Sequence, residues 1–129
     1  MFHSFEELDV WKKACQLCVE LHSLLSCSNA LWLRDQMLRA ALSIASNIAE
    51  GAERNARNDF IRFLNIAKAS AAELRTQLYI AVRIGAVQQD RAAVLIEETK
   101  TIAKMIQALI AALRKPGLAT ENRKLKTEN

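Results

Sequence analysis

The stretch SIASNIAEGAER, residues 43–54, decides the fold of this chain. Its isoleucines and alanines recur three and four positions apart, which is the period of a helix that buries one face. Asn47 and Glu50 interrupt that apolar pattern, and Gly51 follows them. Glycine is the residue best suited to the left-handed position that ends a helix. We therefore expect a helix over about residues 32–50 that stops at Gly51.

The composition of the whole chain favours further helices. The chain has 129 residues, of which 51% are hydrophobic and 25% are charged, with only 3 Gly and 1 Pro. Sheets need more turn residues and more β-branched runs than this, so the composition is that of an all-α protein. A chain of this length folds as one domain around one sizeable core.

Residues that favour the start or the end of a helix divide the chain into four predicted helices. Ser4 and Glu7 form a capping box, which is the pattern that opens a helix. Asn55 is the predicted cap of the third helix, Gly85 is its predicted stop, and Pro116 follows the fourth helix. The predicted helices cover about residues 4–25, 32–50, 56–84 and 88–115.

Short links join the consecutive helices, so neighbouring helices are expected to run antiparallel. The predicted fold class is all-α, an antiparallel up-down-up-down four-helix bundle that residues 1–115 form as a single domain. Residues 116–129 make a polar, charged tail that we expect to be disordered.

The apolar arcs of these helices are wider than one small bundle needs. A helix in such a bundle buries a stripe of about 100°, whereas the second helix has an apolar arc of roughly 200°. On the third helix, three isoleucines project some 110–150° away from the core centre. The expected subunit contacts are Leu38, Leu42, Ala45 and Ala49 on the second helix and Ile66, Ile80 and Ile84 on the third. One patch that meets a different patch closes a ring, so we expect a homo-oligomer; the alternative is a monomer that tolerates surface apolar residues.

Asn47 lies at the edge of the apolar arc, where polar atoms need partners. The third helix has polar residues at similar edge positions, so we expect an interhelical hydrogen-bond network that fixes the helix register. Its expected members are Asn47, Glu50, Arg54, Ser70, Glu73 and Gln77. The rival interpretation is a catalytic carboxylate pair of Glu50 and Glu73. Because no nucleophile or phosphate-cradling loop accompanies that pair, we expect no enzyme and no cofactor.

Basic residues of the third helix share one face, here called the basic stripe: Arg57, Lys68, Arg75 and Arg83. They fall within roughly 80° of one another with no acid among them. A stripe of one sign repels itself and suggests an anionic partner, either nucleic acid or an acidic protein surface. The alternative is a solvated face whose charges meet Asp or Glu from a neighbouring helix or subunit. Aromatic residues make up only 5% of the chain and few could be exposed, which disfavours a stacking platform for single strands.

The net charge of the chain is weak evidence for phosphate binding. Of the total of +4, residues 114–129 carry +3, which leaves only +1 for the rest of the chain. Binding of nucleic acid would therefore depend on a local patch and not on the overall charge.

Cys15, Cys18 and His22 have the spacing of a metal site, C-x2-C-x3-H. A single helix closes a tetrahedral site poorly, and the same face is the apolar seam, where Cys acts as a small hydrophobe. We therefore expect free thiols and no bound metal, as is usual in cytosolic proteins. The apolar stretches are too short to span a membrane, and the acidic Glu6 and Glu7 do not suit a signal peptide, so we expect a cytoplasmic protein.

Three stretches carry a resemblance to a known family: FEELDVWKKA at 5–14, LRDQMLRAALSIASNIAEG at 33–51 and DFIRFLNIAKASAAELRTQL at 59–78. They resemble the four-helix-bundle proteins encoded by intervening sequences in bacterial 23S ribosomal RNA genes. The aromatic–proline pair that usually precedes the second helix in this family is replaced here by SCSNALWL. The family is similar in fold to accessory proteins of diversity-generating retroelements, which assemble as pentameric barrels and bind reverse transcriptase and nucleic acid. The resemblance therefore implies a homo-pentamer without enzymatic activity and an RNA or protein partner.

Overall fold

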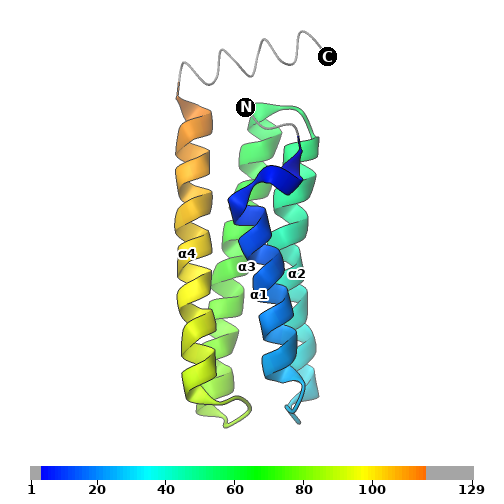
Figure 1. Cartoon of the computed structure of the whole chain (residues 1–129), viewed down its shortest axis with the longest axis vertical. Coiled ribbons are helices and arrows are strands. Elements are labelled where there is room, and N and C mark those ends of the chain that lie inside the picture. The colour runs from blue at the N-terminus through cyan, green and yellow to red at the C-terminus, as the bar shows by residue number, and fades with distance from the viewer. Residues whose placement is uncertain (1–3, 116–129) are drawn as a thin grey trace.

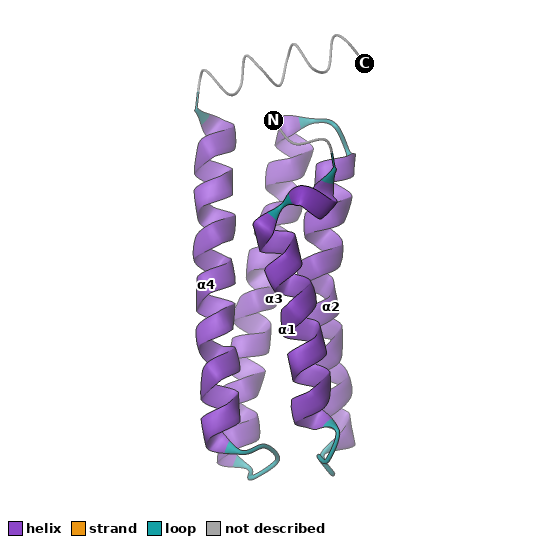
Figure 2. Cartoon of the chain, in the orientation of Figure 1, coloured by secondary structure: helices purple, strands orange, loops and turns teal. Residues whose placement is uncertain are grey.

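Four long helices make up the protein in the computed structural model, which describes residues 4–115 (Figure 1). A short 3₁₀ helix, η1 (Phe5–Glu7), precedes α1 (Asp9–Leu25), α2 (Leu31–Glu53), α3 (Arg57–Arg83) and α4 (Gln89–Arg114). This part of the chain contains no strand (Figure 2). Consecutive helices run in opposite directions, so the predicted all-α, up-down-up-down bundle is confirmed. The tail that was predicted to be disordered lies outside the described residues.

The N-terminal end differs from the prediction because the chain turns at Leu8. The hydroxyl of Ser4 accepts a hydrogen bond from the backbone N–H of Glu6 at 3.1 Å, so Ser4 caps η1 and not α1. Leu8 then adopts an extended conformation and packs against the core, and α1 begins at the next residue. The rings of Phe5 and Trp11 meet edge to face at a centroid distance of 5.1 Å, which holds η1 against the start of α1.

The prediction that Gly51 ends the second helix is wrong. α2 continues to Glu53, and Gly51 is buried inside it. A Cβ atom at this position would lie 2.6 Å from the Cβ of Phe63 and 3.2 Å from Cδ1 of Phe60, both on α3. Gly51 is therefore required for the close approach of α2 and α3, because any side chain would push the two helices apart.

Two residues with positive φ shape the turns at the ends of α3. Asn55, with φ of 56°, takes the left-handed conformation after α2, which Asn tolerates better than most residues. The prediction that Asn55 caps the third helix is wrong, because the N-cap residue of α3 is Ala56. At the other end, Gly85 has φ of 75° and stops α3, as predicted.

The core consists mainly of leucine, isoleucine and alanine side chains from all four helices. Small alanines let the helices approach closely, and the branched residues fill the space between them. Thr99 is a polar residue within this core, and its hydroxyl donates to the carbonyl oxygen of Ile96 at 2.6 Å. Its buried polar atom is therefore satisfied within its own helix.

Side-chain hydrogen bonds between helices show which helices are neighbours. They join Ser43 and Ser70 at 2.8 Å between α2 and α3, Lys68 and Gln107 at 2.8 Å between α3 and α4, and Arg91 and Ser23 at 3.3 Å between α4 and α1. Among the neighbouring pairs of long helices, packing is most extensive between α2 and α3 and least extensive between α1 and α4. The bundle is thus built around the α2–α3 pair.

Candidate functional site

The basic stripe lies on α3 along its seam with α4, a surface that we call the α3–α4 face. Arg57, Lys68 and Arg75 are half-buried, and Arg83 is exposed. The ammonium group of Lys68 donates a hydrogen bond to Oε1 of Gln107 on α4 at 2.8 Å. One member of the stripe is thereby anchored between the two helices, and its charge is not neutralised, since its partner is an amide.

Carboxylates do not neutralise the basic stripe within residues 4–115. The ion pairs in this part of the chain are Arg54–Glu50 at 3.5 Å, Arg62–Asp59 at 3.8 Å and Lys100–Glu97 at 3.0 Å. None of them includes a residue of the stripe. The part of the alternative interpretation that pairs the stripe with acids of a neighbouring helix therefore has no support among the described residues.

Tyr79 lies between Arg75 and Arg83 of the stripe, and Lys100 is the nearby cation of α4. The pKa of Lys100 is raised above its ordinary value by its hydrogen bond and charge interaction with Glu97, and Tyr79 adds to this shift while Arg75 opposes it. These effects place Tyr79, Arg75 and Lys100 within electrostatic reach of one another. Tyr79 is 49% exposed, and Trp32 on α2 is 66% exposed, so more aromatic surface is accessible than the composition led us to expect.

The predicted polar network is only partly assembled. Ser43 and Ser70 make the direct bridge between α2 and α3, with their hydroxyl oxygens 2.8 Å apart. Asn47 stays within α2, where its side-chain amide donates to the carbonyl oxygen of Ser43 at 2.8 Å and to the Ser43 hydroxyl at 2.9 Å. Ser43 is the member that the sequence analysis missed, although it stands one turn before Asn47 on the same edge of the helix.

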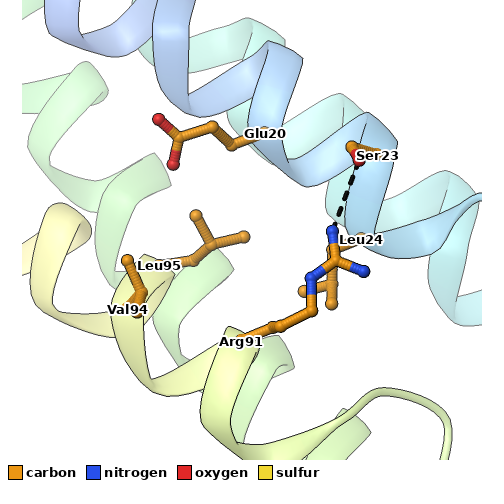
Figure 3. A pocket seen from close by; sticks show the side chains of 6 residues that line it. All are labelled: Glu20, Ser23, Leu24, Arg91, Val94 and Leu95. Atoms are coloured by element: carbon orange, nitrogen blue, oxygen red, sulfur yellow. Dashed lines mark hydrogen bonds between the residues drawn. The ribbon is translucent and has the colours of Figure 1, made fainter.

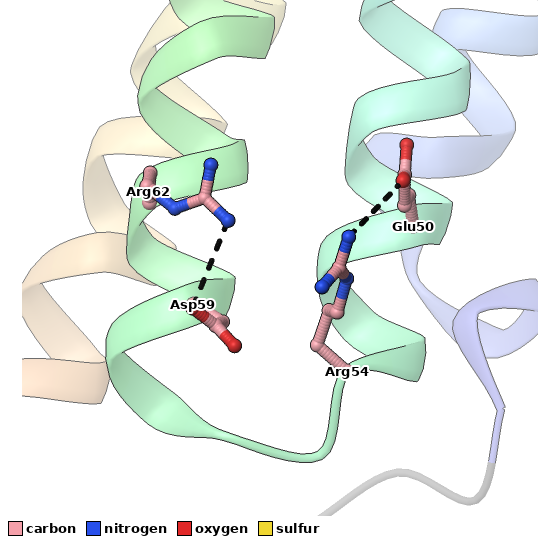
Figure 4. A network of polar contacts seen from close by, with 4 residues as sticks. All are labelled: Glu50, Arg54, Asp59 and Arg62. Atoms are coloured by element: carbon pink, nitrogen blue, oxygen red, sulfur yellow. Dashed lines mark hydrogen bonds and ion pairs between the residues drawn. The ribbon is translucent and has the colours of Figure 1, made fainter.

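The remaining members of the predicted network lie apart from that bridge. Glu50 and Arg54 form an exposed pair one turn apart on α2 (Figure 4). Glu73 is exposed on α3, and the side-chain oxygen of Gln77 is buried without a hydrogen-bond donor in residues 4–115. The six residues therefore do not form one continuous network.

The α2–α3 turn holds two arginines against one aromatic ring. The Cζ atoms of Arg54 and Arg62 lie 4.9 Å and 4.6 Å from the centre of the Phe63 ring. In Figure 4 the ion pairs of these arginines, with Glu50 and Asp59, stand on either side of the turn. Because positive and negative side chains alternate here, this cluster differs from the basic stripe, which has one sign only.

The predicted subunit contacts are mostly accessible. The isoleucine line on α3 is exposed to 40% at Ile66, 41% at Ile80 and 52% at Ile84. On α2, Leu42 is exposed, and Leu38 and Ala49 are half-buried. Ala45 is only 8% exposed, so its surface is already covered by its own bundle and offers no area to a second subunit.

A shallow groove of about 270 Å³ lies between α1 and α4 (Figure 3). Its lining residues are Glu20, Ser23 and Leu24 of α1 and Arg91, Val94 and Leu95 of α4. Arg91 spans the groove through its 3.3 Å hydrogen bond to Ser23. None of these lining residues belongs to the basic stripe, the predicted polar network or the predicted subunit contacts.

The thiols of α1 are poorly suited to bind a metal. Burial raises the pKa of Cys15, and it raises the pKa of Cys18 to about 11, so the thiolate that a metal needs is disfavoured. Within residues 4–115 no group of three or more potential ligands is gathered. In the same part of the chain, no helix has the length and apolar character that a membrane span requires.

Comparisons with known proteins add a family and a solved neighbour. The family model described as 23S rRNA-intervening sequence protein matches residues 6–108. No curated protein matches the chain. Among solved structures, the chain is similar to a protein of unknown function from the S23 ribosomal protein family of Bacteroides thetaiotaomicron. The TM-score is 0.73 at 25% sequence identity, and the match covers 79% of this chain and 95% of that chain.

Proposed function

Since the chain belongs to the 23S rRNA-intervening sequence protein family, we propose that it is a non-enzymatic helical-bundle protein that forms a homo-oligomeric ring and binds RNA on its α3–α4 face. The ring and the RNA partner are features that the family resemblance implies. Each is supported by a different surface of the bundle.

RNA binding is supported chiefly by the lack of a carboxylate partner for the basic stripe within residues 4–115. Lys104 adds a further exposed cation on α4. Uncompensated charges of one sign along a helix attract the opposite charge, and a nucleic acid offers regularly spaced phosphates. The α3–α4 face is therefore the local patch that the low net charge of the bundle requires.

Ring formation is supported by the isoleucine line. Burial of a whole isoleucine side chain is worth about 1.5–3 kcal/mol, and the 40–52% that the bundle leaves exposed would gain roughly half of that, so three of them on one helix favour a covered surface. The opposing patch is Leu38, Leu42 and Ala49 on α2. When two different patches meet, the contact between subunits is heterologous. Such contacts close a ring if the rotation from one subunit to the next is constant and sums to a full turn, and for five subunits that rotation is about 72°.

A salt titration of RNA binding tests the proposal. The dissociation constant of the full-length protein with a labelled RNA is measured by fluorescence anisotropy at several salt concentrations. Four contacts with phosphates of a single strand predict that log affinity falls with log salt with a slope of about −3. The double variant Lys68→Gln, Arg75→Gln removes two of those contacts, so we expect its slope to be shallower by about 1.4.

Lys12→Gln, Lys13→Gln is the matched control, because it removes the same charge from exposed positions on α1. We expect it to keep the wild-type slope. If both double variants change the slope equally, net charge and not the α3–α4 face determines binding. If the wild type does not bind RNA even at low salt, the RNA part of the proposal fails.

A protein-binding scaffold is the second candidate function, and the exposed isoleucine line favours it. In that case the basic stripe would contact acidic residues of its own assembly or of a protein partner. The family resemblance implies that a reverse transcriptase could be such a protein partner. The scaffold predicts no RNA binding at low salt. It also predicts that Lys68→Gln, Arg75→Gln changes the mass of the assembly in light scattering, because the stripe would lie in a protein contact.

A further inference from the structure

We propose that the RNA bound by the α3–α4 face is single-stranded and that one of its bases stacks on the ring of Tyr79. This inference rests on the proposed function, because it names the form of RNA that the same face binds. The basic stripe alone attracts any phosphate backbone and does not distinguish a single strand from a duplex. An accessible aromatic ring within the stripe makes that distinction.

Tyr79 stands between two cations of the stripe. It follows Arg75 by four residues and precedes Arg83 by four, so the three side chains lie on one strip of α3 with about 6 Å between successive positions. Tyr79 is 49% exposed. About half of the residue's surface is therefore accessible to a ligand.

Lys100 flanks Tyr79 from α4. Its ammonium group lies 3.0 Å from Oε2 of Glu97, which fixes the lysine side chain on the outer surface of α4. Tyr79 and Arg75 both act on the pKa of Lys100, so Lys100 lies near this part of the stripe, with its charge paired to Glu97. About two turns before Arg75 on the same stripe, Lys68 is held by Gln107. Proteins that bind single strands combine a cationic track for the backbone with an aromatic ring on which bases stack, and the α3–α4 face has both parts.

The stacking contact requires a base whose flat face is accessible. In a duplex, the bases stack on one another and their faces are hidden, so Tyr79 gains nothing from a duplex beyond the phosphate contacts of its neighbours. In a single strand every base presents a π face, and recognition of RNA loops and ends commonly places such a base on Tyr, Phe or Trp. The ring of Tyr79 therefore favours the single strand.

The test compares a single-stranded oligouridylate of about ten nucleotides with a duplex RNA of the same length. Binding of both to the full-length protein is measured by fluorescence anisotropy. Tyr79→Ala removes the ring, whereas Tyr79→Phe keeps the ring and removes only the hydroxyl. A 2-aminopurine base placed in the single strand reports stacking directly, because its fluorescence falls when it stacks on an aromatic ring.

We expect Tyr79→Ala to weaken binding of the single strand by about 5- to 30-fold and to leave duplex binding within about twofold. Tyr79→Phe should bind both RNAs as the wild type does and should still quench 2-aminopurine. The salt slope of Tyr79→Ala should equal that of the wild type, because no phosphate contact is lost. Circular dichroism checks that each variant is folded; if Tyr79→Ala loses helicity, Tyr79→Leu, which keeps an apolar side chain without a π face, takes its place.

Two results would overturn the stacking inference and leave RNA binding in place. One is an equal loss of affinity for single strand and duplex in Tyr79→Ala, and the other is wild-type affinity of that variant for the single strand. If neither RNA binds the wild type at low salt, the proposed function fails together with the inference. The two failures are therefore distinguishable.

Discussion

Replacing Gly51 by alanine should destabilise the bundle, although alanine is the better helix former. Gly51 lies in the interior of α2, where glycine is normally the weaker choice. The substitution therefore sets local helix propensity against the packing of α2 on α3. The two effects have opposite signs, so the measured change identifies the larger one.

The magnitude follows from the distances around Gly51. In a helix interior, alanine is favoured over glycine by about 1 kcal/mol. The new Cβ would lie 2.6 Å from the Cβ of Phe63, whereas carbon atoms in contact are about 3.5–4.0 Å apart. Overpacking costs about 1–3 kcal/mol, and we expect the upper half of that range because a Cβ cannot move without its backbone. The net loss is then about 1–2 kcal/mol, which lowers Tm by about 4–8 °C.

Urea denaturation followed by circular dichroism measures this loss. All variants are compared at one protomer concentration, because the stability of an oligomer depends on concentration. Ala108→Gly, at an exposed position of α4, measures the propensity effect alone and should cost about 1 kcal/mol. In a Phe63→Leu background Gly51→Ala should cost as much as in the wild type, since leucine keeps the opposing Cβ. A Gly51→Ala protein as stable as the wild type would refute the reasoning.

Ser43→Ala and Ser70→Ala should be coupled by about 1 kcal/mol in a double-mutant cycle, because their hydroxyl oxygens are 2.8 Å apart; additive effects in urea melts would contradict the bridge. Ile80→Asp should dissociate the proposed ring into folded subunits, since it puts an unpaired charge into the contact; a wild-type mass in light scattering would place the contact elsewhere. Cys18 should react with iodoacetamide more slowly than the exposed Cys27 at about pH 8, as measured by mass spectrometry of the modified peptides. Burial raises the pKa of Cys18 to about 11, so its thiolate is scarce below that pH and its reaction should accelerate as the pH rises towards it; equal rates at lower pH would show that the α1 seam opens to solvent.

The four helices were predictable because their apolar period is local information, whereas the role of Gly51 was not. A glycine at the end of an apolar run has two common uses, as a left-handed stop and as a place of close approach. The choice between them depends on Phe60 and Phe63, which follow the turn and belong to the next helix. The sequence alone therefore predicts that the helix ends at Gly51, whereas in the structure Asn55 is the residue that takes the left-handed conformation after α2.

The candidate site was predictable to the extent that its residues come from one helix. The basic stripe shares a face because all four members lie on α3, and a helical wheel of α3 is sufficient to find that face. Whether acids neutralise the stripe depends on α4, whose rotation about its own axis is not local information. The members of the polar bridge were predicted incompletely for a related reason: Asn47 bonds one turn back within α2, and the shorter Ser43 is the residue that reaches Ser70.

The weak seam between α1 and α4 determines how the bundle opens. α1 is the shortest of the four helices, starts after a break at Leu8, and is tied to α4 through the 3.3 Å contact of Arg91 with Ser23 beside an open groove. α2 and α3, by contrast, interlock at Gly51 and at the serine bridge. In native-state hydrogen exchange, the amides of α1 should therefore gain deuterium through partial opening events that leave the α2–α3 hairpin protected. The bundle then behaves as a stable α2–α3 hairpin from which α1 can separate. A partner that binds the separated α1 would reach the core without unfolding the other helices.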